Sequence, residues 1–318
     1  MVSFPHISFE MWGTLSPSRV NKVFGRNVGR TQSTSFAQKL YRMLFVFPPA
    51  MSLRVLRNKA RSLGNKLTPI DSKDDEVAPL VHPIDLHYGI ETGGFIGFEK
   101  LQSGKTSDVF CTAYVGSRPE VIRKALHMLQ DHRGLTFLDL GCGKGRALAV
   151  ASEFPFRRIV GVELAPVLAA AARTNAEIMR RRFPDRTPIE VIEGDASATT
   201  VPDGPLVIYL FHPFYRKIMK GVVRNLEKWL LSAKSKAFVV YYNPVYFDLL
   251  DKSRLFRRVY AGMIDFEPNE EETKDRHQPA ADPLAIWQSA GEPTLEPHPH
   301  AAARIQIVEA GWETKVVW

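Results

Sequence analysis

Apolar residues in the second half of the chain fall in short unbroken runs, and segments with a helical spacing lie between them. Runs without polar alternation are typical of strands that are buried on both faces of a sheet. The strand-type runs are residues 135–140, 157–164, 189–195, 206–211 and 237–242, and the helical segments are residues 119–130, 146–154 and 166–183. Strands that alternate with helices predict an α/β fold with a mostly parallel sheet and helices on both faces.

The region before this pattern is polar and basic. Residues 1–40 show no periodicity, whereas apolar residues between 53 and 63 recur at steps of three and four and indicate a short amphipathic helix. We therefore predict a basic, partly disordered N-terminal extension over residues 1–78 and a folded domain over residues 79–318.

The C-terminal part of the domain departs from the alternating pattern. Residues 265–300 contain nine acids, two bases and six prolines, a composition that predicts an acidic, loop-like insertion. The apolar segments 303–310 and 314–318 that follow are typical of edge strands, and we expect them to pair as an antiparallel closing hairpin.

Charge is unevenly distributed along the 318 residues, whose net charge is +8. Residues 1–70 carry eleven Lys or Arg and a single acid, Glu10, so the remainder is close to neutral. Nucleic acid or an anionic membrane surface is therefore expected to bind only through residues 1–70. The chain has two cysteines, which favours a reducing compartment, and we expect a cytoplasmic protein. The Ser/Arg-rich, acid-poor start leaves import into an organelle as the alternative.

A glycine-rich loop follows the first predicted strand and opens a helix. Gly141, Gly143 and Gly145 allow a sharp turn and let a ligand approach the backbone. The following helix directs its N-terminal N–H groups to the same place. The dinucleotide fingerprint is Gly-x-Gly-x-x-Gly, whereas this loop has Gly-x-Gly-x-Gly and is preceded by Asp139. An acid at that position repels a pyrophosphate but suits a cofactor with a cationic amino-acid end, such as S-adenosylmethionine.

Two further acids end the neighbouring strands. Glu163 ends the second strand, where a carboxylate can bind both hydroxyls of a ribose, and Asp195 ends the third, where it can accept the exocyclic amine of adenine. Each has a simpler interpretation, Glu163 as a solvated strand end and Asp195 as a turn former or helix cap. Because parallel strands end at one edge of a sheet, we expect these acids and Asp139 to surround one ligand.

These motifs together resemble the class I S-adenosylmethionine-dependent methyltransferases. The matching segments read FLDLGCGKGRALAVAS, IVGVEL, IEVIEGDAS and VIYLFHPF. The segments HYGIETGG and FPFRRIVGVELAP are similar to a bacterial group within that superfamily, and the whole series is more distantly similar to the non-SET histone lysine methyltransferases. The resemblance covers about residues 110–262 and implies a Rossmann-like fold with a seven-strand-type sheet.

The resemblance also implies which residues bind the cofactor. Loop residues would hold its methionine part, Glu163 its ribose, and two residues after the third strand its adenine. The complete set is Asp139, Gly141, Cys142, Gly143, Gly145, Glu163, Asp195 and Ala196.

The fourth strand ends in His212, Pro213 and Phe214, which are the candidate catalytic residues. Many relatives that methylate nitrogen have Asn or Asp here, followed by Pro-Pro and an aromatic residue. This chain keeps Pro213 and Phe214 but has His212 instead. A neutral imidazole can accept a proton, so His212 is a candidate general base. The alternative is that His212 only caps the strand and packs on Phe214.

The sequence thus predicts a methyltransferase that acts on nitrogen, in a protein or in another amine acceptor. A small-molecule methyltransferase and a non-catalytic binding module remain alternatives, whereas the glycine spacing disfavours an NAD-dependent oxidoreductase. Asn243 could reach the same crevice, and residues 87–94 with Tyr114 could form a lid. No metal is expected, because His298 and His300 lack partners with metal-ligand spacing.

Overall fold

The computed structural model describes residues 41–42, 46, 81–101, 103–129, 131–233, 235–265, 281–290, 297–308 and 313–317. The predicted amphipathic helix within residues 53–63 and the domain boundary after residue 78 lie outside the described residues, so both stay predictions. Tyr41 and Val46, two described residues of the predicted extension, pack against the core of the domain.

Helices and strands alternate over residues 119–193, and the fourth strand then follows the third directly. The strands are β1 (Thr136–Leu140), β2 (Arg158–Glu163), β3 (Ile189–Glu193), β4 (Leu206–Phe211), β5 (Ala237–Tyr242), β6 (Phe256–Asp265), β7 (Ala281–Ser289), β8 (Arg304–Val308) and β9 (Glu313–Val317). The helices are α4 (Pro83–Tyr88), α5 (Pro119–His127), α6 (Arg146–Ala151), α7 (Pro166–Arg182), α8 (Arg216–Ala233) and α9 (Phe247–Asp251), with the 3-10 helices η3 (Phe98–Lys100), η4 (Thr106–Phe110) and η5 (Pro299–Ala302). Among the described helices, none combines the length and the apolar character needed to cross a membrane.

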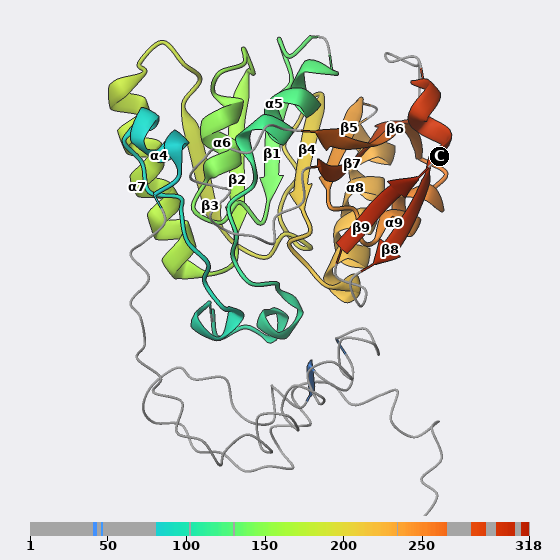
Figure 1. Ribbon diagram of the computed structural model, residues 1–318, viewed down its shortest axis with the longest axis horizontal. Coiled ribbons are helices and arrows are strands. Elements are labelled where there is room, and N and C mark those ends of the chain that lie inside the picture. Colours follow the sequence, from blue (N-terminus) through green and yellow to red (C-terminus); the bar gives the residue numbers. More distant parts are fainter. Residues whose placement is uncertain are drawn as a thin grey trace, which may run out of the picture.

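The main sheet has seven strands in the order β3-β2-β1-β4-β5-β7-β6 (Figure 1). Strands β1 to β5 pair in parallel, and β7 is antiparallel to both of its neighbours. The predicted α/β fold with a mostly parallel sheet is confirmed. The strand order reverses between β1 and β4, and open sheets of this type bind ligands at the carboxyl ends of the strands beside such a reversal.

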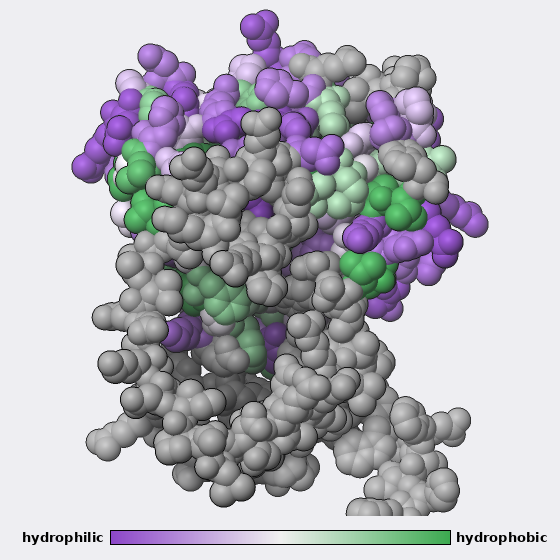
Figure 2. Space-filling view, in the orientation of Figure 1, coloured by the Kyte–Doolittle hydropathy of each residue, from purple (hydrophilic) through white to green (hydrophobic). Residues whose placement is uncertain are grey.

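Two layers of buried side chains cover the sheet, because its central strands are apolar on both faces. One layer joins the sheet to α4, α5, α6 and α7 and includes Tyr88, Ile122 and Leu148. The other joins it to α8 and α9 and includes Val222 and Leu250. In Figure 2 the described part of the surface is mostly hydrophilic, with hydrophobic residues gathered in a few separate places.

The predicted loop-like insertion at residues 265–300 is wrong for Ala281–Ser289, which forms β7 inside the sheet. The prolines and acids of this segment are typical of a loop, and for that reason the strand was not predicted. Pro283 lacks an N–H, but its carbonyl oxygen accepts a hydrogen bond from the Asn243 N–H at 2.9 Å. Asp282 is buried against Tyr242 and Arg118, and its carboxylate accepts a hydrogen bond from the tyrosine hydroxyl. Both polar features are therefore satisfied within the sheet.

The predicted closing hairpin is confirmed as an antiparallel pair, β8 with β9. These strands form a separate two-stranded sheet and are not edge strands of the main sheet, whose end is occupied by β6 and β7. Ile305 and Val316 bury the hairpin against the layer that also contains α8 and α9.

Candidate active site

The glycine-rich loop needs its glycines for both backbone conformation and space. Gly141, Gly143 and Gly145 have φ values of +88°, +55° and +86°, in the left-handed region that glycine adopts without a steric cost. A Cβ on Gly141 would lie 2.5 Å from Cβ of Pro213, and one on Gly143 would lie 2.3 Å from Cε2 of Tyr114. The loop therefore lies directly against the end of β4 and against the segment before α5.

The Glu163 carboxylate holds this loop in place. One of its oxygens accepts a hydrogen bond from the Gly143 N–H at 2.8 Å, and the other accepts one from the Ala165 N–H at 2.9 Å. The carboxylate thus joins the loop to the start of α7. Glu163 is buried, so it is not the solvated strand end of the simpler interpretation. Burial raises the pKa of Glu163, although these backbone hydrogen bonds oppose the increase.

Asp139 is the second buried acid of the site. Burial raises the pKa of its carboxyl group well above the usual value, and the nearby Glu163 raises it further by repulsion between like charges. Two acids that repel each other in a buried place favour the entry of a positively charged ligand, because a cation offsets the cost of ionising them.

A cavity that is partly open to solvent lies between the loop and the segment before α5. Among the predicted site residues, the cavity lining includes Asp139, Gly141, Cys142, Gly143, Glu163, Pro213 and Phe214. The structure therefore brings the predicted cofactor loop and the predicted acceptor end of β4 to one cavity.

The predicted adenine residues lie outside this lining. The Asp195 carboxylate accepts hydrogen bonds from the N–H and the hydroxyl of Ser197, at 2.9 and 2.7 Å. Partial burial tends to raise the pKa of Asp195, but the hydrogen bonds from Ser197 and Ser107 outweigh it, and the net shift is downward. Ala196 is buried in the layer beside α8. This geometry matches the turn-forming interpretation of Asp195, and the adenine role stays a prediction.

His212 also lies outside the cavity lining. Its ring packs edge-on against Tyr215 and Tyr246, with centroid distances of 6.5 and 5.7 Å, and Nδ1 lies 3.5 Å from Nδ2 of Asn243. The residue has a φ of +35°, a conformation that His and Asn adopt more readily than most residues. The geometry favours a structural role at the end of β4, and catalysis by His212 stays a prediction.

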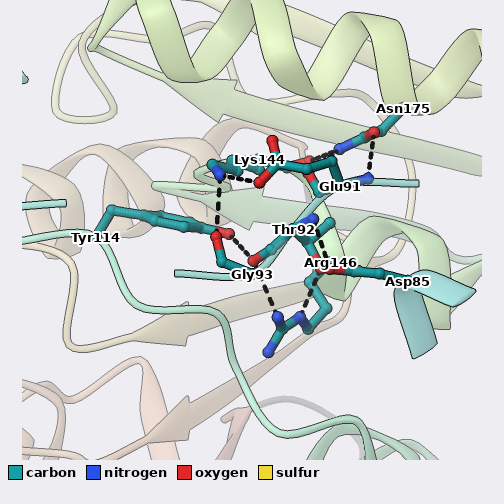
Figure 3. Close-up of polar contacts among 8 residues, drawn as sticks. All are labelled: Asp85, Glu91, Thr92, Gly93, Tyr114, Lys144, Arg146 and Asn175. Atoms are coloured by element: carbon teal, nitrogen blue, oxygen red, sulfur yellow. Dashed lines mark hydrogen bonds and ion pairs between the residues drawn. The ribbon is translucent and has the colours of Figure 1, made fainter. Parts of the chain in front are cut away.

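The sequence interpretation missed most of one wall of the cavity. Residues 111–117 run along it, and within this stretch only Tyr114 was a candidate. The Tyr114 hydroxyl donates to the carbonyl oxygen of Thr92 at 2.6 Å, so Tyr114 and the ETGG motif lie together, as the lid hypothesis requires (Figure 3). Arg146 also lines the cavity. The lone arginine after the third glycine carried no sequence signal for this placement.

The described part of the chain contains no cluster of potential metal ligands. No group of three or more His, Cys, Asp or Glu side chains is arranged there to hold a metal ion. His298 instead accepts a hydrogen bond from the N–H of His300 at 3.2 Å and caps η5. Cys111 and Cys142 are both free thiols.

Comparison with known proteins agrees with the motifs of the site. Residues 138–216 match the family model of a methyltransferase domain. A comparison with curated proteins finds no match. A 23S rRNA methyltransferase structure is similar at 19% identity over 57% of this chain and 71% of that chain, with a TM-score of 0.35. Precorrin-6y C5,15-methyltransferase from Geobacter metallireducens is similar at 15% identity over 54% and 87%, with a TM-score of 0.39. A dimethyladenosine transferase from Plasmodium falciparum is similar at 14% identity over 56% and 64%, with a TM-score of 0.38.

The fold and the site define an α/β protein with a ligand cavity at the strand-order reversal of its sheet. Residues 138–216 form a methyltransferase domain, of a family that uses S-adenosylmethionine as the methyl donor. The cofactor supplies an electrophilic methyl group on a positively charged sulfur. The cavity suits it, because the loop leaves no room for side chains and two buried acids favour a cation.

Proposed function

We propose that this enzyme transfers the methyl group to a nitrogen atom, in a protein lysine or in another amine. The observation that carries the proposal is that Pro213 and Phe214 line the same cavity as Asp139, Gly141 and Gly143. An acceptor that enters beside Pro213 and Phe214 would meet a cofactor bound at the glycine loop within that one space. Methyl transfer is an in-line displacement, so placing the two reactants accounts for much of the catalysis.

The end of β4 offers hydrogen-bond acceptors that suit an amine. The carbonyl oxygens of His212 and Pro213 accept hydrogen bonds from the Thr112 hydroxyl at 3.2 and 3.3 Å. The Pro213 carbonyl oxygen also accepts a hydrogen bond from the Thr112 N–H at 3.2 Å, so of the two it is the His212 carbonyl oxygen whose second lone pair we expect to accept an N–H of the substrate. An amine held in this way directs its own lone pair to the methyl group.

The surroundings of these carbonyls favour the uncharged form of an amine. Phe211, Pro213 and Phe214 line this end of the cavity, and apolar surroundings disfavour an ammonium ion because they remove its hydration. An amine that arrives neutral needs no protein base. This agrees with the position of His212, whose ring packs against Tyr215 and Tyr246 instead of lining the cavity.

The test uses S-adenosylmethionine with an isotopically labelled methyl group, offered with lysine-containing peptides and a panel of small amines. Products are hydrolysed and the labelled atom is identified by mass spectrometry. The proposal predicts label on nitrogen. Label that appears only on oxygen, sulfur or carbon would refute it.

A pair of variants tests where the acceptor lies. Phe214→Leu should lower turnover, by on the order of tenfold to a hundredfold, because the acceptor loses its aromatic contact and its alignment. The matched control is Phe183→Leu, at a partly buried phenylalanine beyond the end of α7 that is not in the cavity lining. Equal loss in both variants would contradict the placement of the acceptor at Phe214.

A further inference from the structure

The glycine loop carries two buried cations that are held in different ways. Lys144 and Arg146 are 8% and 6% exposed. The Lys144 ammonium has an acid as its partner, the Glu91 carboxylate, and it also donates to the carbonyl oxygen of Gly93 at 2.9 Å. Lys144 is therefore neutralised by a residue of the ETGG motif.

Within the part of the chain that the structure describes, the hydrogen-bond partners of Arg146 are all neutral. Its Nε donates to the Thr92 hydroxyl oxygen at 2.7 Å, and one terminal nitrogen donates to the Thr92 carbonyl oxygen at 2.9 Å (Figure 3). The other terminal nitrogen donates to the Ser117 carbonyl oxygen at 3.4 Å. The guanidinium lies close against Gly116, where a Cβ would be 2.4 Å from its Cζ. These contacts fix the plane of the guanidinium and use three of its five N–H groups.

Thr92, the main partner of this guanidinium, is itself held by an acid, Asp85. The Asp85 carboxylate accepts hydrogen bonds from the hydroxyl and from the N–H of Thr92, the latter at 2.9 Å. Thr92 therefore donates to Asp85 and accepts from Arg146. This arrangement holds the guanidinium in position, but the Asp85 carboxylate contacts Thr92 and not the guanidinium. A buried cation without a direct counter-charge is costly, and it favours binding of an anion.

Arg146 is also the one Lys or Arg among the described residues that line the cavity. The acids of that lining are Asp139 and Glu163. S-Adenosylmethionine has two positive groups, the sulfonium and the ammonium, and one negative group, the carboxylate of its amino-acid end. We propose that Arg146 binds this carboxylate, with Thr92 as the positioning residue that aims the guanidinium. The proposal rests on the cofactor assignment above and adds a residue that the family motif does not identify.

The wild-type protein tests the proposal with two ligands. Isothermal titration calorimetry compares S-adenosylhomocysteine with its decarboxylated analogue, which keeps the adenosine, the thioether and the ammonium. A charge-assisted hydrogen bond predicts that the analogue binds about tenfold to a hundredfold more weakly. Equal affinities would overturn the proposal and leave the cofactor assignment intact, whereas absence of binding by both ligands in folded protein would overturn both.

Variants distinguish two roles for Arg146, as a ligand of the cofactor carboxylate or as a purely structural residue, which we call a brace. Arg146→Gln keeps donors for Thr92 but removes the charge, so it should lose affinity for S-adenosylhomocysteine and bind the analogue with little change. A brace would lower both affinities by the same factor, which would contradict the proposal. Lys144→Gln is the matched control, because that cation already has Glu91, and it should leave the ratio of the two affinities unchanged. If Arg146→Gln does not fold, Thr92→Ser and Thr92→Val give the same comparison, and only the valine variant should reduce the ratio.

Discussion

Replacing Gly143 by alanine perturbs the loop and the cavity wall together. The residue has a φ of +55°, which costs an L-residue roughly 1–2 kcal/mol. The new Cβ would lie 2.3 Å from Cε2 and 2.6 Å from Cδ2 of Tyr114, so the ring must move. That ring is buried, and its hydroxyl is held by Thr92, so overpacking should add roughly 1–3 kcal/mol. We expect Gly143→Ala to lower the free energy of unfolding by roughly 2–5 kcal/mol in total.

Gly134→Ala is the matched control for this prediction. Gly134 has a φ of +79°, but a Cβ there would meet no atom within 4 Å, so only the backbone cost remains. Urea unfolding of both variants measures the difference, which isolates the clash with Tyr114. Gly143→Ala should also weaken binding of S-adenosylhomocysteine, because Tyr114 lines the cavity. In a Tyr114→Ala background the added loss of stability from Gly143→Ala should shrink to the backbone cost. Equal unfolding free energies for the two alanine variants, with unchanged binding in both, would refute the steric reasoning.

Three further predictions follow from the buried polar groups. His212→Asn should keep methyl transfer, because Asn tolerates the positive φ; a loss of a hundredfold or more in turnover, with unchanged affinity for S-adenosylhomocysteine, would instead indicate a general base. The raised pKa values of Asp139 and Glu163 mean that the folded state holds these protons more tightly than the unfolded chain does. Stability should therefore fall as the pH rises from the ordinary carboxyl range through the raised values, while affinity for the cationic cofactor rises; calorimetry across pH should show a smaller dependence in Asp139→Asn. Burial raises the pKa values of Cys111 and Cys142, so both thiols should react with a thiol reagent far more slowly in native than in urea-unfolded protein, and rapid labelling of the native protein would contradict their burial.

The fold could be predicted where the apolar pattern was unbroken. β1, β2, β4 and β5 are almost entirely buried runs, and they and the more exposed β3 appear where the sequence places them. β7 could not be predicted in this way, because Pro283 and the acids around it are typical of a loop. Their tolerance depends on partners that are distant in sequence, such as the Tyr242 hydroxyl and the Arg118 guanidinium.

The site could be predicted where the backbone conformation or the position at a strand end requires a particular residue type. Asp139 lies near the end of β1 and the three glycines follow that strand, and this spacing together with the acid indicated the cofactor. The wall formed by residues 111–117 has no such spacing, and its place depends on how Ile96 and Tyr114 pair across the chain. His212 was placed correctly at the end of β4, but the direction of its ring is set by the left-handed backbone and by Tyr215 and Tyr246.

The most direct test of the central claim is a calorimetric titration of the full chain with S-adenosylhomocysteine, with NAD as the parallel ligand and Gly143→Arg as the variant that fills the loop. The account predicts one binding site for S-adenosylhomocysteine per chain, no heat of binding with NAD, and loss of the site in the variant. Binding of NAD in place of S-adenosylhomocysteine, or binding that Gly143→Arg leaves intact, would contradict the assignment of the cofactor to this cavity.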